Sequence, residues 1–215
     1  PENDLLEHEL LVLPTYSPPY FEDFENTPYY FWQVEDENST WEYGKPSGSL
    51  IDSAASGSYV WGTNLSGNYP NNDTAFLESP CFNLEDIRNP VFETKIFSDF
   101  EEGKDGLALY DSLDNGETWN MVPKTGSYEW SWYKSEHIKA LGTPGWDTTT
   151  TDWITAKEFL PSEIIGQSGV KFRFVFASDS NNINDGVAID DVRIYEAPPD
   201  VGVTSMPFPT TQCEL

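Results

Sequence analysis

The sequence has few of the residues on which disulfide and catalytic chemistry depend. Its two cysteines, Cys81 and Cys213, lie far apart, so a disulfide framework is not indicated, although one bridge between them is possible. Its two histidines, His8 and His137, lie in separate segments without a motif around either. No H-E-x-x-H, G-x-S-x-G or C-x-x-C motif occurs, which argues against zinc and against nucleophilic catalysis.

Long apolar runs are also missing. No stretch of about 18 apolar residues occurs and the chain does not open with a signal-peptide pattern, so we expect neither a membrane span nor a signal peptide. The chain begins on Pro1 without an initiator Met. We therefore expect a fragment of a longer protein whose targeting signals lie elsewhere.

Basic residues are heavily outnumbered. The chain has 11 Lys and Arg against 37 Asp and Glu, a net charge of −26. Such a surface repels nucleic acid and anionic membranes, so we expect neither as a partner, and it attracts divalent cations. Aromatic residues, by contrast, make up 15% of the chain, which is typical of a packed fold rather than a disordered one.

The clearest pattern runs from Gly169 to Glu196 and predicts two strands around a polar loop. Apolar side chains alternate along the first strand at Val170, Phe172, Phe174 and Phe176. In the second strand, four positions share the expected core-facing side: Ala188, Asp190, Val192 and Ile194. A carboxylate in that register must be paired or bind a cation, because burying an isolated charge costs too much free energy.

Short strands separated by Gly, Pro, Asn and Asp continue along the whole chain. The other expected strands are 20–25, 29–34, 58–62, 74–78, 91–100, 107–112, 118–122, 130–134 and 153–159. Helical signals are confined to residues 161–167. The pattern predicts an all-β fold, a two-sheet antiparallel jelly-roll sandwich.

Three parts of the chain differ in character. Residues 1–19 are interpreted as a linker or the tail of a preceding domain, and residues 20–196 as the jelly-roll domain. Residues 197–215 open with prolines and then begin a new strand pattern, so we expect a linker and the first strand of a truncated Ig-like module.

Six short sequence segments, taken in their order along the chain, resemble those of a known family. They are FEDFEN (21–26), WEYGKPSG (41–48), YVWGTNLSGNYPNND (59–73), LESPCFNL (77–84), DGLALYDSLDNGETW (105–119) and GVAIDDVRI (186–194). In this order they resemble the MAM-like and cleaved-adhesin jelly rolls of large secreted or cell-surface proteins, particularly gliding, adhesin or type IX secreted proteins of Bacteroidetes. Eukaryotic MAM domains carry paired cysteines, and only Cys81 lies inside this domain, so the bacterial relationship is favoured.

The resemblance implies a non-catalytic, extracellular module with a structural calcium where the first strand meets the last. Carried over to this chain, the expected ligands are Glu25, Asn64 and Asp190, with Asp23 and Asp191 as neighbours that could share the role. Carboxylate, amide and carbonyl oxygens suit calcium. Two alternatives stay open for these carboxylates: a hydrogen-bonded network without metal, and a general acid/base pair.

Two acidic motifs have plain structural interpretations. Residues 112–119 fit S-x-D-x-G-x-T-W, an Asp-box, and its single occurrence predicts a β-hairpin rather than a propeller. The loop 179–185 (DSNNIND) lacks the order and closing Glu of an EF-hand and is interpreted as solvated.

Two further groups are candidate surface sites. Four aromatic residues could stack on sugar rings or fill the core: Tyr128, Trp130, Trp132 and Trp146. Three Asp-Ser/Thr-aliphatic triplets resemble bacterial O-glycosylation sites, at Ser53, Thr74 and Ser112.

These observations predict a calcium-stabilised adhesion, binding or spacer module without enzymatic activity. Its expected partners are a glycan or protein on another surface and the other domains of the same polypeptide. The alternative is a carbohydrate-binding accessory domain of a secreted hydrolase or peptidase.

Overall fold

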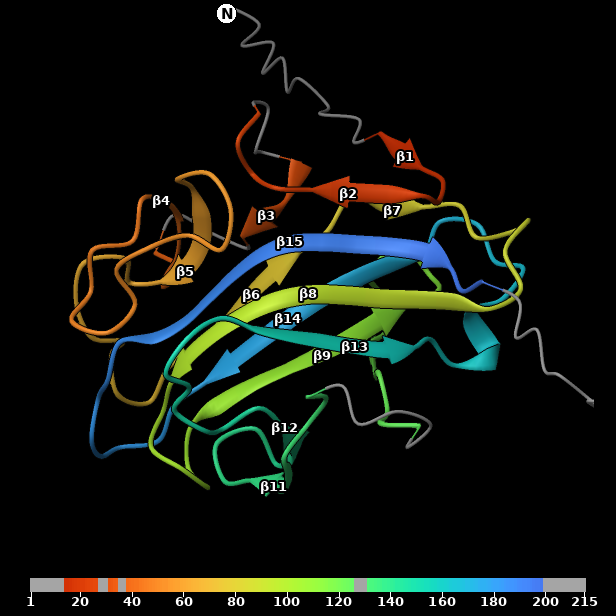
Figure 1. Cartoon of the computed structure of the whole chain (residues 1–215). Helices are drawn as coiled ribbons and strands as arrows, with labels where there is room; N and C mark the ends of the chain where they lie inside the picture. The colour runs from red at the N-terminus through yellow and green to blue at the C-terminus, as the bar shows by residue number, and fades with distance from the viewer. Residues whose placement is uncertain (1–13, 27–30, 35–37, 126–130, 199–215) are drawn as a thin grey trace, which may run out of the picture.

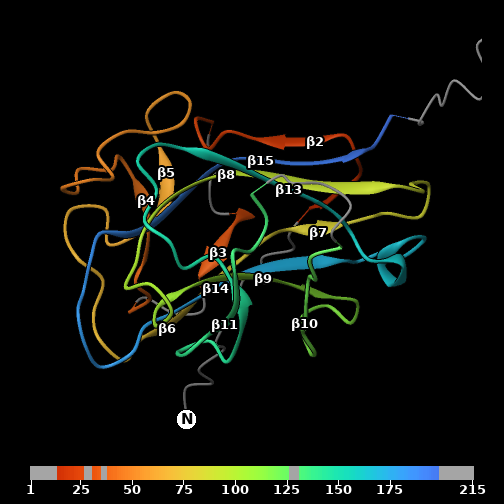
Figure 2. The same cartoon turned by 60° about the horizontal axis from the view of Figure 1, so that its bottom comes forward.

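The computed structural model describes residues 14–26, 31–34, 38–125 and 131–198. Within these ranges the chain forms two main β-sheets packed face to face, seen as two layers in Figures 1 and 2, and two further sheets of two strands each. A 3-10 turn, η2 (Ser162–Ile164), lies inside the expected helical turn. No helix in the described ranges is long and apolar enough to cross a membrane. The predicted all-β, two-sheet antiparallel sandwich is confirmed.

The larger sheet has the order β13-β8-β15-β5-β4, with β2 paired to β15. Its strands are β2 (Tyr20–Glu22), β4 (Trp41–Gly44), β5 (Val60–Thr63), β8 (Pro90–Asp99), β13 (Ile154–Phe159) and β15 (Gly186–Glu196). The smaller sheet, β10-β9-β14-β6-β3, consists of β3 (Gln33–Val34), β6 (Thr74–Glu78), β9 (Gly106–Ser112), β10 (Asn120–Met121) and β14 (Lys171–Ala177). Both sheets are antiparallel throughout.

Aromatic side chains fill the space between the sheets. The alternation predicted for β14 is confirmed, because Phe172, Phe174 and Phe176 are fully buried in the main core. Phe92 of β8 lies 5.1 Å from Phe172 between ring centroids, so the two sheets meet through aromatic contacts.

The end of the segment 1–19 contacts the sandwich. Strand β1 (Thr15–Tyr16) pairs in parallel with β7 (Cys81–Phe82), and Tyr16 packs against the main core. The end of the segment interpreted as a linker therefore belongs to the sandwich. Of the proposed Ig-like segment, residues from 199 onward lie outside the described ranges.

Other differences concern short elements. Strands β4, β7 and β12 (Thr143–Gly145) were not expected, and β11 (Ser135–Ile138) lies just after the expected strand 130–134. Residues 131–134 form no strand in the structure. These elements are two to four residues long, too short for an alternating pattern to stand out.

Strand β15 contains a bulge that overturns the predicted register. The pairing with β8 shifts between Asp190 and Arg193, and Asp191 adopts a φ of 49°. Val192 and Ile194 point into the main core as expected, but Ala188 belongs to a separate apolar cluster under the β4–β5 loop (residues 45–59). Asp190 is 0% exposed, as predicted, yet it faces this loop and not the main core.

Asp111 on β9 is a buried carboxyl outside the predicted sites. It is 4% exposed, and burial, followed by the nearby Glu163 charge, raises its pKa to about 6. The folded chain therefore keeps this proton to higher pH than the unfolded chain, whose carboxyl has a pKa of about 3.9. The stabilisation by protonated Asp111 is thus complete below about pH 4 and is lost as the pH rises to about 6.

We expect Asp111→Asn to stabilise the domain at pH 8 by about 1–2 kcal/mol, allowing for solvent screening, and to change little at pH 4. Urea unfolding of both proteins across this pH range measures the effect, with the exposed Asp86→Asn as the control. Parallel stability curves for Asp111→Asn and the parent would contradict the assignment.

Candidate functional site

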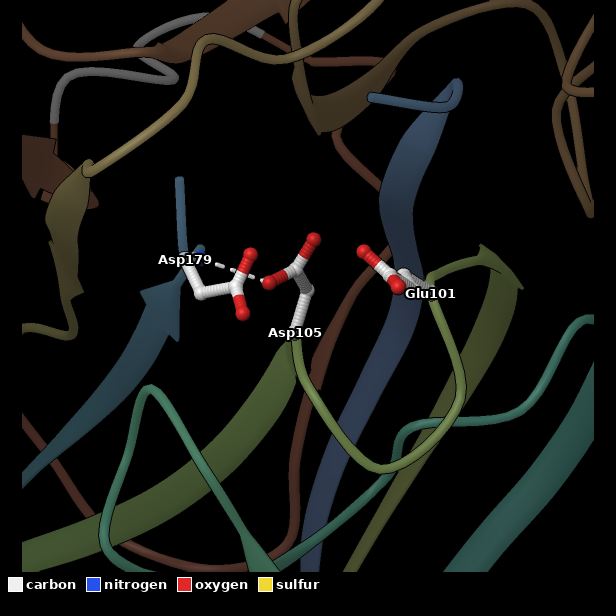
Figure 3. Close-up of side chains that lie close together, drawn as sticks. All are labelled: Glu101, Asp105 and Asp179. Carbon is white, nitrogen blue, oxygen red and sulfur yellow. Dashed lines mark hydrogen bonds between the residues drawn. The ribbon is translucent and has the colours of Figure 1, made fainter. Parts of the chain in front are cut away.

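Three acidic side chains converge at one end of the sandwich. One carboxylate oxygen from each of Glu101, Asp105 and Asp179 lies within 4.8 Å of the other two. Figure 3 shows the Asp105 carboxylate between the other two, with all three groups directed toward one another. We call this group the acidic triad. It brings together the turn after β8, the start of β9 and the end of β14.

Asp105 is the central and most buried member of the acidic triad. It is 0% exposed, and its two oxygens accept hydrogen bonds from the Asp179 backbone N–H at 2.6 Å and the Tyr69 hydroxyl at 2.8 Å. Burial raises the pKa of Asp105, while these two hydrogen bonds act in the opposite direction. These two hydrogen bonds hold the Asp105 carboxylate close to the carboxylates of Glu101 and Asp179.

The outer members differ in how their charge is compensated. Asp179 forms a 2.8 Å ion pair with Lys139, whose hydrogen bond lowers the Asp179 pKa. Glu101 Oε2 is buried and has no hydrogen-bond partner among the described residues. Three carboxylates therefore face one ammonium group, and like charges this close repel unless a proton or a cation intervenes.

The donor set of the acidic triad fits a hard cation. Calcium binds carboxylate and carbonyl oxygens with loose geometry, and an unpartnered buried carboxylate oxygen is an available ligand. This buried acidic group can hold a metal ion. Sequence reasoning missed it because its members come from three segments, although the acidic run around residues 101–105 was a usable signal.

The predicted calcium residues lie elsewhere, around the β4–β5 loop. Glu25 Oε1 accepts the backbone N–H groups of Ser58 and Tyr59, both at 2.6 Å. Asp190 Oδ2 accepts those of Ala55 and Ser56, at 2.9 and 3.0 Å. The end of β2 and the bulge in β15 thus hold the same loop through carboxylates.

Neighbouring acids complete this arrangement, which we call the carboxylate–loop network. Asp191 Oδ1 accepts the Ser56 hydroxyl, and Asp23 Oδ1 accepts the Glu25 backbone N–H. Burial raises the pKa of Asp190 to about 7 even though three backbone N–H groups donate to it. Hydrogen bonds thus join these acids to one another and to the β4–β5 loop.

Asn64 does not join the other predicted ligands. Asn64 directly follows β5, whereas Tyr59, whose N–H donates to Glu25, directly precedes that strand. The length of β5 therefore separates Asn64 from the Glu25 contact by roughly 15 Å. The Asn64 amide instead donates to the Asn68 carbonyl oxygen at 2.6 Å.

The Asp-box is a hairpin, as predicted. Asp114 accepts hydrogen bonds from Ser112 and from both the backbone and the hydroxyl of Thr118, which lower its pKa to about 2. The Trp119 indole covers the turn and donates to the Gly116 carbonyl oxygen. These contacts stabilise the turn between β9 and β10.

The loop 179–185 is less solvated than predicted. Its first and last residues are buried, at 8% exposed for Asp179 and 4% for Asp185. The Asp185 carboxylate accepts hydrogen bonds from Ser49, Leu50 and Ile51, so it holds the β4–β5 loop from a second side. The alternation signal cannot detect such contacts because they join distant segments.

Two of the four aromatic residues predicted as a candidate surface site belong to the core. Trp132 and Trp146 are 1% and 2% exposed and lie 4.9 Å apart between ring centroids. Their side chains therefore cannot stack on a ligand at the surface, and the packing alternative holds for them. Tyr128 and Trp130 lie outside the described residues.

The candidate modification sites differ in accessibility. Ser53 and Thr74 are exposed, whereas Ser112 is fully buried in the Asp-box hairpin. A glycan on Ser112 is therefore incompatible with the folded domain. Cys81 is a free thiol, and Cys213 lies outside the described residues.

Comparisons with known proteins find solved structures with a similar fold. A carbohydrate-binding module studied for the promiscuous specificity of the β-sandwich superfamily is 12% identical, with a TM-score of 0.50, over 85% of this chain and 63% of that one. This likeness shows the fold. The K1 and K3 cleaved adhesin domains of Lys-gingipain from Porphyromonas gingivalis W83 are also similar in structure.

The K1 domain is 14% identical with a TM-score of 0.48, over 84% of this chain and 99% of that one. The K3 domain is 15% identical with a TM-score of 0.49, over 83% and 98%. The predicted resemblance to cleaved-adhesin domains is thus confirmed as a structural similarity.

In sequence, the chain is 29% identical over 143 residues to Bacillopeptidase F of Bacillus subtilis (strain 168). The match covers 62% of this chain and 10% of that protein, so the chain spans about a tenth of the length of this curated relative. No protein-family model matches the sequence.

Proposed function

We propose that this chain is a non-catalytic, extracellular binding module of a larger secreted or surface protein, stabilised by calcium. The observation that carries the proposal is that buried and partly buried carboxylates hold loops through hydrogen bonds. Asp185, Asp190 and Glu25 each accept backbone N–H groups from the β4–β5 loop. Glu158, fully buried, likewise binds Thr125.

Carboxylates engaged in this way shape loops and do not form an acid/base pair in an open cleft. His137, the only histidine among the described residues, is exposed on β11. The loops that these carboxylates hold lie at the ends of the sandwich, where binding surfaces can vary without disturbing the sheets.

The proposed calcium has two candidate positions. The acidic triad is the first, because Glu101 offers an unpartnered buried oxygen. The carboxylate–loop network is the second. The family resemblance implied Glu25, Asn64 and Asp190 as ligands there, with Asp23 and Asp191 as neighbours. Because the Asn64 amide bonds to Asn68 instead, we propose the four acids as its ligands. A cation at either position would offset the repulsion among acids in a chain of net charge −26.

The second candidate is a carbohydrate-binding accessory domain of a secreted peptidase or hydrolase. The sequence match to one tenth of Bacillopeptidase F and the fold shared with a carbohydrate-binding module both favour it. In either case we propose other domains of the same polypeptide as neighbours, type IX secretion as the route, and Ser53 and Thr74 as O-glycosylation positions.

We expect no turnover of glycoside, ester or peptide substrates by the purified domain, with or without calcium, because no nucleophile–base pair occurs among the described residues. Chromogenic substrate panels measure this directly. Turnover that falls in both Glu101→Gln and Asp190→Asn would contradict the proposal, whereas turnover unchanged in both would indicate a contaminating enzyme.

A further inference from the structure

Two adjoining hollows lie beside β2 and the C-terminal half of β15. The larger, of about 510 Å³, is lined among others by Pro18, Ile87 and Arg88. The smaller, of about 270 Å³, is lined by Phe21, Glu93 and Arg193, among others. Pro19 and Tyr195 line both hollows, so the two form one continuous groove, which we call the β2–β15 groove.

The walls of the β2–β15 groove offer apolar and aromatic surface. Phe21 is 50% exposed, the most exposed large apolar side chain among the described residues, and Tyr195 is partly exposed beside it. An exposed ring next to a hollow leaves apolar surface in water that a sugar ring can cover through its C–H face.

Two of the three arginines of the chain line the groove. Arg88 and Arg193 are exposed, and neither guanidinium forms a salt bridge within the described part of the chain. The Arg193 guanidinium lies 4.4 Å from the centre of the Phe21 ring, which holds it in place while its N–H groups remain available. A guanidinium in this position can bind a carboxylate through two parallel hydrogen bonds.

Three acidic residues line the groove: Asp86 is exposed, whereas Glu93 and Glu196 are engaged by the protein. Glu93 Oε2 accepts the Tyr195 hydroxyl at 2.7 Å and lies 3.7 Å from the Lys157 ammonium. The Glu196 carboxylate accepts the backbone N–H groups of Arg88 and Asn89. With two of its three carboxylates engaged, the groove still presents two guanidinium groups as donors in a chain whose surface is strongly acidic.

We propose that the β2–β15 groove binds an acidic oligosaccharide, with a sugar ring against Phe21 and Tyr195 and a uronic carboxylate on Arg193 or Arg88. This inference rests on the proposed function of the chain as a binding module. Ring stacking and carboxylate pairing are complementary to the two features that the groove combines. A neutral glycan offers no carboxylate to pair with either guanidinium group.

Isothermal titration calorimetry tests the proposal with three acidic ligands: glucuronic acid-substituted xylo-oligosaccharide, oligogalacturonate and hyaluronan oligosaccharide. Unsubstituted xylo-oligosaccharide is the neutral control for the first of these. We expect at least one acidic ligand to bind at least tenfold more tightly than the neutral one. Its affinity should fall as salt rises from about 50 to 500 mM, since the pairing is electrostatic.

The expected effect of Arg193→Gln or Phe21→Ala is an increase in Kd of about tenfold or more, because each removes one of the two recognition elements. Lys45→Gln is the matched control, an exposed cation 5.2 Å from the Tyr59 ring on another part of the surface, and should change Kd less than about twofold. Should Phe21→Ala lower the melting temperature, Arg88→Gln provides the second groove variant.

Three results overturn the inference while leaving the binding module intact. They are no acidic ligand binding below about 1 mM, a preference for the neutral ligand, and acidic binding that the groove variants do not weaken. Enzymatic turnover of any of these ligands would instead contradict the proposed function itself.

Discussion

Gly57→Ala is expected to destabilise the domain by about 3–5 kcal/mol. Gly57 has a φ of 56°, a backbone conformation that costs an L-residue about 1 kcal/mol. A Cβ there would also collide with the Glu25 carboxyl group, which accepts the N–H groups of Ser58 and Tyr59. Losing these two hydrogen bonds to a charged group adds about 2–4 kcal/mol.

The two contributions can be separated by a matched variant. Gly142 has a φ of 71° and no heavy atom within 4 Å of an added Cβ, so Gly142→Ala measures the backbone cost alone, about 1 kcal/mol. Urea unfolding of both variants gives the difference. If Gly57→Ala costs no more than Gly142→Ala, the Glu25 contact does not hold the β4–β5 loop in the way described.

Strands with a long alternating pattern were predictable from the sequence. β6 matches its expected range, and β8, β9, β13, β14 and β15 match within one residue at each end, because each buries one face against the other sheet. Elements of two to four residues were missed or misplaced. Such elements are determined by the neighbours with which they pair, as β1 is by β7.

The candidate sites were less predictable than the strands. The burial of Asp190 followed from its place in an apolar strand, but the bulge beside it changed which side of the sheet it faces. The acidic triad joins residues about 75 positions apart in the sequence, so only the folded chain brings Asp179 to Glu101 and Asp105. Likewise, no periodic pattern marks the groove arginines as neighbours.

Removing calcium is expected to have the other large effect. A ligand that binds only the folded state at a hundredfold excess over its Kd stabilises by about 2.7 kcal/mol. For a domain of this size that free energy corresponds to about 5–10 °C in melting temperature. We therefore expect the midpoint to fall by this amount when millimolar calcium is replaced by a chelator.

Glu101→Gln should distinguish the acidic triad from the carboxylate–loop network. Removing the Glu101 charge takes away a ligand and also relieves repulsion with Asp105 and Asp179. The variant should thus lose most of the calcium response and melt slightly higher than the parent in chelator. Glu102→Gln, at the exposed neighbouring position, is the control and should behave as the parent does.

The most direct test of the account is the melting temperature of the parent, Glu101→Gln and Asp190→Asn in calcium and in chelator. We predict a calcium-dependent rise in the parent, its loss in Glu101→Gln, and a lower midpoint with the rise retained in Asp190→Asn. If only Asp190→Asn loses the calcium-dependent rise in melting temperature, the ion binds at the carboxylate–loop network instead. An equal midpoint for the parent in calcium and in chelator would contradict the claim that a cation stabilises this domain.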